Sequence, residues 1–264
     1  MKVAFLGAGR MGSTILKMVQ RASIPMSAEV CEPDEKVRAA LAKELKGVKL
    51  AAKAEDLGEP EAVLLAVKPK MLKETAGWLR ARKDSYLLIS ILAGVGTDTL
   101  AKEAGPKARV VRAMPNQALR QNEGVTAICS GPGATKADLE TTRKMFAVGG
   151  HVLEVDEDQM DVVTALSGSG PAFMAKWAEE LADAAARAGL TPKVAEELAA
   201  RTMLGTAAIL VREGIKPGEL CAAVASPGGT TEAGLKAMQP GLRSLAEKAT
   251  IAAIQRAKEL AQGG

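Results

Sequence analysis

Lys2-Val-Ala-Phe-Leu-Gly7-Ala-Gly9-Arg-Met-Gly12 opens the chain. The first five residues are mostly apolar, as in a short buried strand, and the last six match G-x-G-x-x-G at the start of a helical pattern. In such a turn Gly7 makes the sharp bend, Gly9 lets a pyrophosphate approach the backbone, and Gly12 lets the helix pack on the strand. The stretch therefore predicts a strand–turn–helix unit that binds a dinucleotide.

An acidic residue follows the second predicted strand, Ala28–Cys31. This residue, Glu32, lies 20 positions after Gly12. A carboxylate at that distance hydrogen-bonds the 2′-OH of a ribose and repels a 2′-phosphate, which favours NADH over NADPH. Lys36 and Arg38 are close enough in the sequence to weaken this preference. The alternative is that they are only surface residues of the next predicted helix.

Further strands alternate with helices through the first half of the chain. Buried or half-buried strand patterns occur at residues 48–51, 62–67, 86–91, 109–113, 125–129 and 151–155, with a helix at 136–147. This alternation predicts a doubly wound α/β sheet of the Rossmann type. Because such sheets bind ligands at the carboxyl ends of their strands, the residues that follow these strands are candidates for a cofactor site. They include Lys68, Ala93, Met114 and Asn116.

The second half is predicted to be entirely helical. We therefore divide the chain into a dinucleotide-binding domain, residues 1–155, and a helical dimerisation and substrate-binding domain, residues 156–264. Ser167-Gly-Ser-Gly-Pro171 begins one helix, and further helices are predicted at 191–212, 217–225, 231–238 and 240–262. These helices are apolar on more than one side. They predict an intertwined homodimer, unless the first domain covers the apolar surface.

Ser226-Pro-Gly-Gly-Thr-Thr231 lies between two of these helices. Pro227 stops the first helix, and Gly228 and Gly229 allow positive φ angles and a close approach of a ligand. Free amides and the helix dipole at the start of the next helix favour an anion. The stretch predicts a pocket for a small carboxylate or phosphate; the alternative is a well-capped turn between helices.

Composition limits the remaining classes of function. The 264 residues are 47% hydrophobic with a net charge of +4, and only six are aromatic, so stacking platforms for single-stranded nucleic acid are scarce. Residues 1–155 carry 24 Lys and Arg against 17 Asp and Glu, which suits a phosphate-bearing ligand. Three scattered cysteines, no signal peptide and no long apolar run predict a cytoplasmic protein without disulfides or membrane contact. The only histidine, His151, has no clustered partners, so no metal site is expected.

Several of these motifs occur together in an order that resembles the pyrroline-5-carboxylate reductase family. Besides the glycine-rich turn and the Ser226–Thr231 stretch, they are Ala66-Val-Lys-Pro69, Ser90-Ile-Leu-Ala-Gly-Val95, Leu166-Ser-Gly-Ser-Gly-Pro-Ala172 and Ala233-Gly-Leu235. The resemblance covers nearly the whole chain. It implies a Rossmann domain followed by an all-α dimerisation domain, dimers that often assemble into decamers, and NAD(P)H-dependent reduction of 1-pyrroline-5-carboxylate to L-proline, the last step of proline biosynthesis.

The resemblance also implies roles for particular residues. The active site lies between the cofactor of one subunit and the Ser226–Thr231 loop of its partner. Leu6, Gly7, Ala8, Gly9, Arg10 and Met11 hold the diphosphate, and Ala66, Val67, Lys68, Pro69 and Ala93 line the nicotinamide half. Met114 and Asn116 complete the predicted cofactor set. Ser226, Gly229, and the backbone amides of Thr230 and Thr231 bind the substrate carboxylate, with the Thr231 hydroxyl as the candidate catalytic group.

A few positions depart from the family pattern, and two rival functions remain. Gln117-Ala118 stands where Thr-Pro is common, Ala54 where Asn is common, and Glu32 where users of NADP tend to have a small hydroxyl residue. These departures leave the implied reaction intact and bear on the cofactor preference, which leans toward NADH. A β-hydroxyacid dehydrogenase would need a catalytic lysine such as Lys176, but the spacing around it does not fit. A sensor that binds NAD(H) without turnover is the other alternative.

Overall fold

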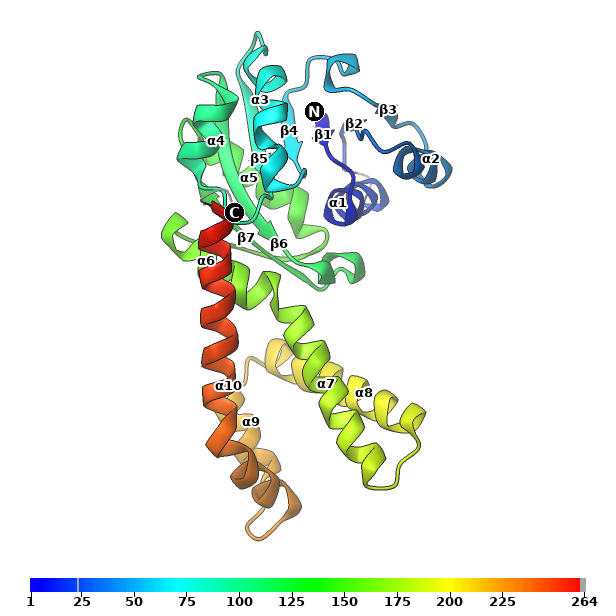
Figure 1. The fold of residues 1–264 in the computed structure, drawn as a ribbon, viewed down its shortest axis with the longest axis vertical. Coiled ribbons are helices and arrows are strands. Elements are labelled where there is room, and N and C mark those ends of the chain that lie inside the picture. Colours follow the sequence, from blue (N-terminus) through cyan, green and yellow to red (C-terminus); the bar gives the residue numbers. More distant parts are fainter. Residues whose placement is uncertain (23, 262–264) are drawn as a thin grey trace. The chain divides into compact units, whose positions relative to one another are not determined.

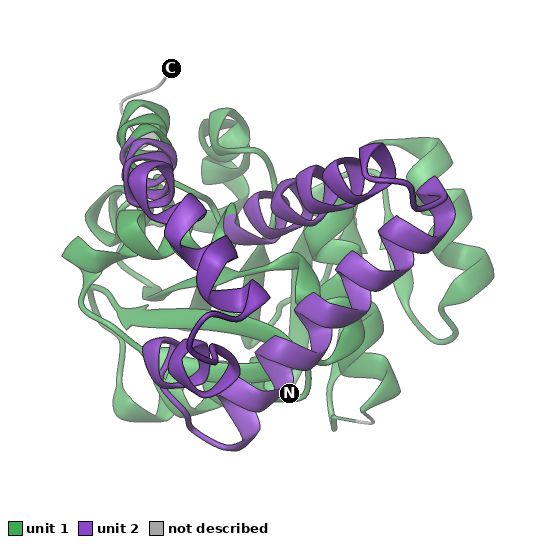
Figure 2. Cartoon of the chain, turned by 90° about the horizontal axis from the view of Figure 1, so that it is seen from below, with its two compact units in different colours: residues 1–169, 252–264 green, residues 170–251 purple. Residues whose placement is uncertain are grey.

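The computed structural model describes residues 1–22 and 24–261. By their contacts, residues 1–169 and those from 252 onward form one compact unit, and residues 170–251 form a second (Figure 2). We call these unit 1 and unit 2. The predicted domain boundary between residues 155 and 156 stays a prediction, because these units group contacts and do not test it.

Unit 1 is built on an eight-stranded sheet in the order β3-β2-β1-β4-β5-β6-β7-β8 (Figure 1). Neighbouring strands are parallel except β6 and β7, which are antiparallel because a short 3-10 turn joins them in place of a crossover helix. The strands are β1 (Lys2–Leu6), β2 (Ser27–Cys31), β3 (Lys49–Ala51), β4 (Ala62–Leu65), β5 (Tyr86–Ser90), β6 (Ala108–Pro115), β7 (Gly124–Ser130) and β8 (Gly150–Glu154).

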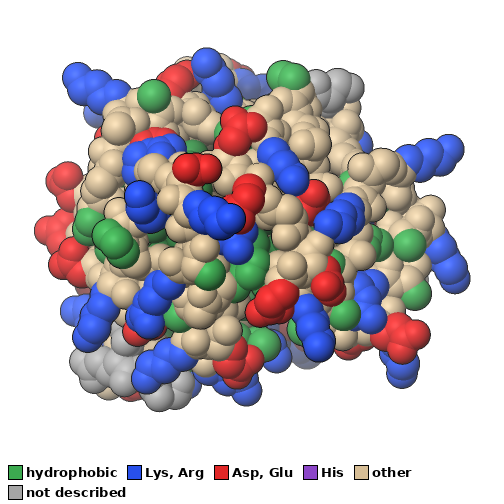
Figure 3. All heavy atoms as spheres, turned by 90° about the horizontal axis from the view of Figure 1, so that it is seen from above, with side chains coloured by type: hydrophobic (Ala, Val, Ile, Leu, Met, Phe, Trp, Pro, Cys, Tyr) green, Lys and Arg blue, Asp and Glu red, His purple; other side chains and the backbone are tan. Residues whose placement is uncertain are grey.

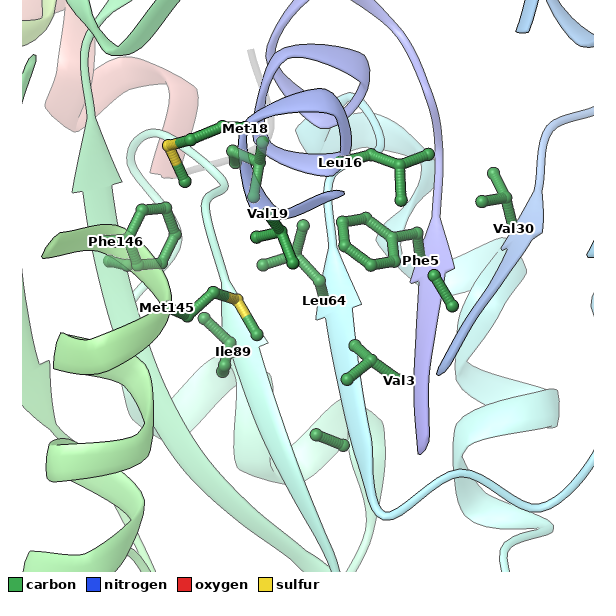
Figure 4. Close-up of a cluster of buried hydrophobic side chains, with 14 of the residues drawn as sticks. Val3, Phe5, Leu16, Met18, Val19, Val30, Leu64, Ile89, Met145 and Phe146 are labelled. Carbon is green, nitrogen blue, oxygen red and sulfur yellow. The ribbon is translucent and has the colours of Figure 1, made fainter. Parts of the chain in front are cut away.

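Helices cover both faces of this sheet because its central strands are apolar on both sides. Val3 and Phe5 of β1 point into one hydrophobic cluster with α1 and α5, where Figure 4 draws them with Leu16 and Phe146. The intervening residue Ala4 belongs to the cluster on the other face, with α3 and α4. The helices of unit 1 up to β8 are α1 (Arg10–Arg21), α2 (Glu35–Glu44), α3 (Leu72–Arg80), α4 (Thr97–Ala104) and α5 (Lys136–Ala147).

The strand order reverses between β1 and β4. Strand β1 is followed in space by β2 and β3 on one side and by β4 to β8 on the other. Open α/β sheets bind ligands in the crevice outside the carboxyl ends of the strands at such a switch point. The fold therefore brings the segments after β1, β2, β4 and β5 to one edge, as the doubly wound prediction requires.

The chain after β8 is helical, as predicted, but its last helices differ from the prediction. The elements are α6 (Met160–Val163), a π-helical turn (Thr164–Gly168), α7 (Gly170–Arg187), α8 (Pro192–Arg212), α9 (Pro217–Val224) and α10 (Thr230–Ala261). The separate helices predicted at 231–238 and 240–262 are one continuous helix that contains Pro240, so that division was wrong. Proline removes one backbone hydrogen bond but keeps a helical φ, and the long helix tolerates this cost. Gln262 lies outside the described residues.

Charged side chains of both signs are spread over the surface of the protein (Figure 3). Lys and Arg side chains are interspersed with Asp and Glu on the face drawn in Figure 3, so the basic excess of the first half makes no continuous patch there. No described helix is both long and apolar enough to cross a membrane. Cys31, Cys129 and Cys221 are free thiols.

Candidate cofactor and substrate sites

Backbone hydrogen bonds join the predicted cofactor segments at the switch point. The Gly7 amide donates to the Cys31 carbonyl oxygen (2.9 Å), and the Ala66 amide donates to the Leu6 carbonyl oxygen (2.8 Å). The Ile91 amide continues the row by donating to the Leu65 carbonyl oxygen (3.1 Å). The turn after β1 and the segments after β4 and β5 therefore form one continuous rim.

Gly7 makes the tight turn of this rim in a conformation that side chains rarely adopt. Its φ is +92°, and a Cβ built there would lie 2.8 Å from the Ala66 carbonyl oxygen. Both the backbone angle and the lack of space for a side chain therefore require glycine at position 7. This is the role that the motif predicts for its first glycine.

We expect Gly7→Ala to lower the free energy of unfolding by about 1–3 kcal/mol, since strain and the clash with the Ala66 backbone add. Urea unfolding would measure the change. Gly77→Ala is the matched control: Gly77 lies inside α3 with nothing within 4 Å of a built Cβ, so it should gain up to about 1 kcal/mol. Equal effects of the two substitutions would contradict the assigned role of Gly7.

The start of α1 is open for an anion. Gly9 is the N-cap of α1, no side chain caps it, and a Cβ built on Gly9 would meet nothing within 4 Å. Helix N-termini with unpaired amides and free space before them bind phosphate groups. The residues present thus fit the diphosphate of a dinucleotide, with the Arg10 side chain exposed and Met11 half-buried beside it.

Glu32 is held rigidly beside this turn. Its side chain is buried; Oε2 accepts from the Ala8 amide (2.8 Å) and Oε1 accepts from the Asp34 amide (3.0 Å). The carboxylate therefore connects the glycine-rich turn to the end of β2. A fixed negative charge lies where the motif predicts contact with the adenosine ribose.

Arg38 is also close to Glu32, but its guanidinium is engaged. Nη1 of Arg38 donates to the carbonyl oxygens of Glu32 and Pro33, both at 2.7 Å. Arg38 is therefore more than a surface residue of α2, since its side chain links this helix to the segment that follows β2. Lys36 contributes only its backbone amide, which donates to Asp34 Oδ1 (2.8 Å) in the helix cap.

Small and half-buried residues follow β4 and β5. Ala66, Val67 and Pro69 are partly exposed after β4, and Lys68 is exposed. Pro69 begins a single 3-10 turn before α3. Ala93, after β5, is likewise partly exposed, between buried neighbours. These positions present backbone and small side chains at the rim, which suits a flat ring lying against them.

Met114 and Asn116 end β6 and begin the turn after it, but the side chain of Asn116 already has partners. Asn116 Oδ1 accepts from the amides of Ala118 and Val125, each at 3.2 Å, and Nδ2 donates to Ser167 Oγ (3.3 Å). Met114 is half-buried and packs with the buried β7 residues Ala127 and Cys129. A direct contact of Asn116 with the cofactor stays a prediction. In the sequence, Ser167 stands out only as the first residue of the Ser167–Pro171 stretch that begins a helix.

The Ser226–Thr231 loop of unit 2 has a backbone that binds a carboxylate. Gly228 has a φ of +72°, and its amide donates to the Glu232 carboxylate (2.7 Å). Hydrogen bonds from Lys236 and from this amide lower the pKa of Glu232. The loop turns through a bond from the Gly229 amide to the Ser226 carbonyl oxygen (2.9 Å), and α10 then begins at Thr230.

Thr231 is half-buried at the edge of a cavity of about 300 Å³ within unit 2. Its neighbours along the wall include Thr206, Cys221 and Leu235, and most of the lining is apolar. Ser226 and Thr230 are exposed and Gly229 is half-buried. The predicted substrate residues thus lie together on one loop, and one of them, Thr231, lines a small apolar cavity.

Two alternative chemistries lack support in these residues. The described residues hold no group of three or more His, Cys, Asp and Glu side chains that could bind a metal ion. Lys176, the candidate base of a β-hydroxyacid dehydrogenase, is exposed, and hydrogen bonds with Glu179 and Glu180 raise its pKa. Ion pairs of this kind, between exposed side chains one turn apart on the same helix, are typical of a solvated helix surface.

Comparison with known proteins decides the family. The model described as "Pyrroline-5-carboxylate reductase dimerisation" matches residues 157–260, and the model "NADP oxidoreductase coenzyme F420-dependent" matches residues 2–94. A pyrroline-5-carboxylate reductase of Thermus thermophilus is 38% identical over 266 residues, with 99% of each chain covered. The chain belongs to the pyrroline-5-carboxylate reductase family.

Solved structures of pyrroline-5-carboxylate reductases share its fold. The enzyme from Coxiella burnetii is 33% identical with a TM-score of 0.87, covering 98% of this chain and 97% of its own. The one from Plasmodium falciparum, with NADP bound, is 26% identical with a TM-score of 0.84, covering 99% and 98%. Membership confirms the predicted α/β-plus-helical fold, and the NAD(P)H-dependent reductase function in proline biosynthesis. The matched dimerisation region implies a homodimer.

Proposed function

We propose that this chain binds NAD(P)H along the rim at the switch point and reduces the C=N bond of 1-pyrroline-5-carboxylate with it. The observation that carries the proposal is the open start of α1 beside Gly9, in line with the row of hydrogen bonds through Gly7 and Ala66. The residues proposed to form the cofactor site are Leu6, Gly7, Ala8, Gly9, Arg10, Met11, Gly12, Glu32, Ala66, Val67, Lys68, Pro69, Ala93, Met114 and Asn116.

The substrate carboxylate binds at the Ser226–Thr231 loop. Amides of Thr230 and Thr231, with the Ser226 hydroxyl and close approach at Gly229, receive the negative charge. The bond from the Gly228 amide to the chain's own Glu232 carboxylate supports this role, since a backbone amide of the same loop already donates to a carboxylate.

Chemistry at this site needs little acid–base help from the protein. The bound cofactor supplies the hydride that reduces the C=N bond. An imine can enter already protonated. The main task of the protein is therefore to hold the substrate ring in the correct orientation relative to the nicotinamide ring. We assign to Thr231 Oγ a hydrogen bond with the ring nitrogen, which fixes the ring relative to its carboxylate.

NADH is the proposed preferred cofactor. The Glu32 carboxylate is buried, fixed by the Ala8 and Asp34 amides, and cannot easily swing away from an incoming group. A 2′-phosphate placed near it meets a like charge in a partly dry site, whereas a ribose hydroxyl can donate to it. The nearby Arg38 guanidinium offers little compensation for this repulsion, because carbonyl oxygens already occupy its Nη1.

The active form is proposed to be at least a homodimer, with each substrate loop serving the cofactor of the partner subunit. Large apolar side chains of unit 2 are exposed in the single chain, including Leu204 (68%) and Val211 (80%), as expected for a surface that a second copy covers. Assembly of dimers into decamers remains a proposal by family resemblance, as does the helical domain boundary near residue 156. The free thiols support a reducing, cytoplasmic location.

Mixing two variants that are each impaired in a different half of the site tests the shared site. One variant carries Gly9→Asp, which places a negative charge where the diphosphate binds, and the other carries Thr231→Ala. If the cofactor of one subunit meets the loop of its partner, mixed dimers contain one intact site, and substrate-dependent NADH oxidation should return to about a quarter of the unaltered rate, as statistical mixing predicts. No recovery after verified subunit exchange would contradict the shared site.

A further inference from the structure

Asn116 and Ser167 form a polar pair whose orientation the backbone fixes. Both partners of Asn116 Oδ1 are backbone amides, at Ala118 and Val125, and an amide can only donate. The oxygen of the Asn116 side chain must therefore face them. The NH₂ group in turn faces Ser167 and donates to its Oγ (3.3 Å). Asn116 is also buried, with 8% of its surface exposed, so the pair is held in one geometry.

Ser167 has a proton to donate once it accepts from Asn116. No described residue accepts a hydrogen bond from its hydroxyl, and the side chain is partly exposed. A hydroxyl that accepts one bond in a fixed direction points its own proton away from that donor. The unused donor of Ser167 is therefore turned outward from the pair.

A π-helical turn places this hydroxyl against the end of β6. The Ser169 amide donates to the Thr164 carbonyl oxygen five residues earlier (2.9 Å), which inserts one residue relative to an α-helix. A Cβ built on Gly168 would lie 2.5 Å from Met114 Cε, so the turn packs closely on β6. Such π turns occur frequently at functional sites. In Figure 1 the neighbouring helix α6 lies beside β6 and β7.

The end of β6 belongs to the nicotinamide end of the proposed cofactor site. Strand β2, with Glu32, lies on one side of β1, and β4, β5 and β6 follow on the other side. Strands β5 and β6 are parallel, so the segments that contain Ala93 and Asn116 leave the sheet at the same edge. A dinucleotide with its adenosine ribose at Glu32 and its diphosphate at α1 extends toward this edge.

We propose that Ser167 binds the carboxamide of the nicotinamide ring by donating its hydroxyl proton to the carboxamide oxygen, and that Asn116 positions that hydroxyl. The carboxamide is the one polar substituent of the ring, and an outward donor at this edge matches its oxygen. This proposal rests on the cofactor site proposed above. Ser167 is a cofactor-binding residue, and Asn116 acts through it.

Equilibrium binding of two probes tests the assignment. Calorimetry would compare NADH with ADP-ribose, which lacks the nicotinamide ring, on the full chain. Ser167→Ala should raise the Kd for NADH about 3- to 10-fold, the range for one neutral hydrogen bond, and leave the Kd for ADP-ribose unchanged. Ser169→Ala, in the same motif, is the matched control and should change neither value.

The role of Asn116 is tested through Ser167. Asn116→Asp keeps an oxygen for the Ala118 and Val125 amides but replaces the donor to Ser167 with an acceptor, which captures the serine proton. It should weaken NADH binding as Ser167→Ala does, and adding it to Ser167→Ala should have no further effect. Additive losses would show that Asn116 does not act through Ser167.

The remaining outcomes separate this proposal from the one it rests on. An unchanged Kd for NADH in Ser167→Ala, or equal weakening of NADH and ADP-ribose, would overturn the assignment of Ser167 while leaving the cofactor site intact. If the unaltered chain binds neither probe, the cofactor site itself is wrong, and this proposal is wrong with it.

Discussion

Glu32→Gln should shift the ratio of kcat/KM for NADH to that for NADPH toward NADPH by about 10- to 100-fold. The substitution removes a fixed charge next to the proposed position of the 2′-phosphate, and such a like-charge contact is worth about 1–4 kcal/mol at a partly buried site. Gln keeps an oxygen that can accept from the Ala8 amide, so the glycine-rich turn should keep its shape. Initial rates with each cofactor, at saturating substrate, give the ratio.

Two further variants separate charge from structure in that experiment. Glu32→Ser removes both bonds to the Ala8 and Asp34 amides and should lower NADH efficiency more than Glu32→Gln does. Arg38→Ala tests the alternative that Arg38 receives the phosphate. If Arg38→Ala lowers NADPH efficiency selectively while Glu32→Gln leaves the ratio unchanged, the assignment of cofactor preference to Glu32 is wrong.

Thr231→Ala should lower kcat/KM for 1-pyrroline-5-carboxylate by about 10- to 1,000-fold, the range for losing one positioned hydrogen bond to the reacting group. The Kd for NADH should not change, since the cofactor contacts lie in unit 1. Thr231→Ser keeps the hydroxyl and should recover much of the loss. Steady-state kinetics with varied substrate would measure each effect.

A second threonine on the same cavity provides the control. Thr206 lines the cavity beside Thr231, but its Oγ1 donates to the Thr202 carbonyl oxygen (2.8 Å) within α8. Thr206→Ala should therefore leave kcat/KM within about threefold of the unaltered value, as expected for loss of a local hydrogen bond with no substrate contact. Equal losses in Thr206→Ala and Thr231→Ala would assign the effect to packing of the cavity.

The glycine-rich turn and the sheet could be predicted because local rules determine them. The backbone at position 7 has a positive φ, which requires glycine. Along β1, alternate residues belong to the hydrophobic clusters on opposite faces of the sheet, because the strand is apolar on both sides. The antiparallel pairing of β6 and β7 was not predicted, although the connection between these strands is too short for the crossover that a parallel pair needs. Continuity of α10 through Pro240 was also missed, since proline usually marks an end.

Site residues that act through tertiary contacts could not be derived from the sequence. The hydrogen bonds from Asn116 to Ser167, and from the Ala8 amide to Glu32, join residues far apart in the chain. The sequence identified Asn116 and Glu32 as candidates from their positions after strands, but their partners depend on how the strands pair. Ser167 carried a weaker signal, a serine among glycines before a helix, which capping alone explains.

The most direct test of the account is the yield of L-proline from 1-pyrroline-5-carboxylate, measured against oxidation of NADH and of NADPH in parallel reactions. We expect one L-proline formed per cofactor oxidised, no oxidation without substrate, and a higher kcat/KM with NADH. Cofactor binding without proline formation would contradict the assigned reaction and support a nucleotide sensor. Proline formation with a strong preference for NADPH would keep the reaction and contradict the role of Glu32.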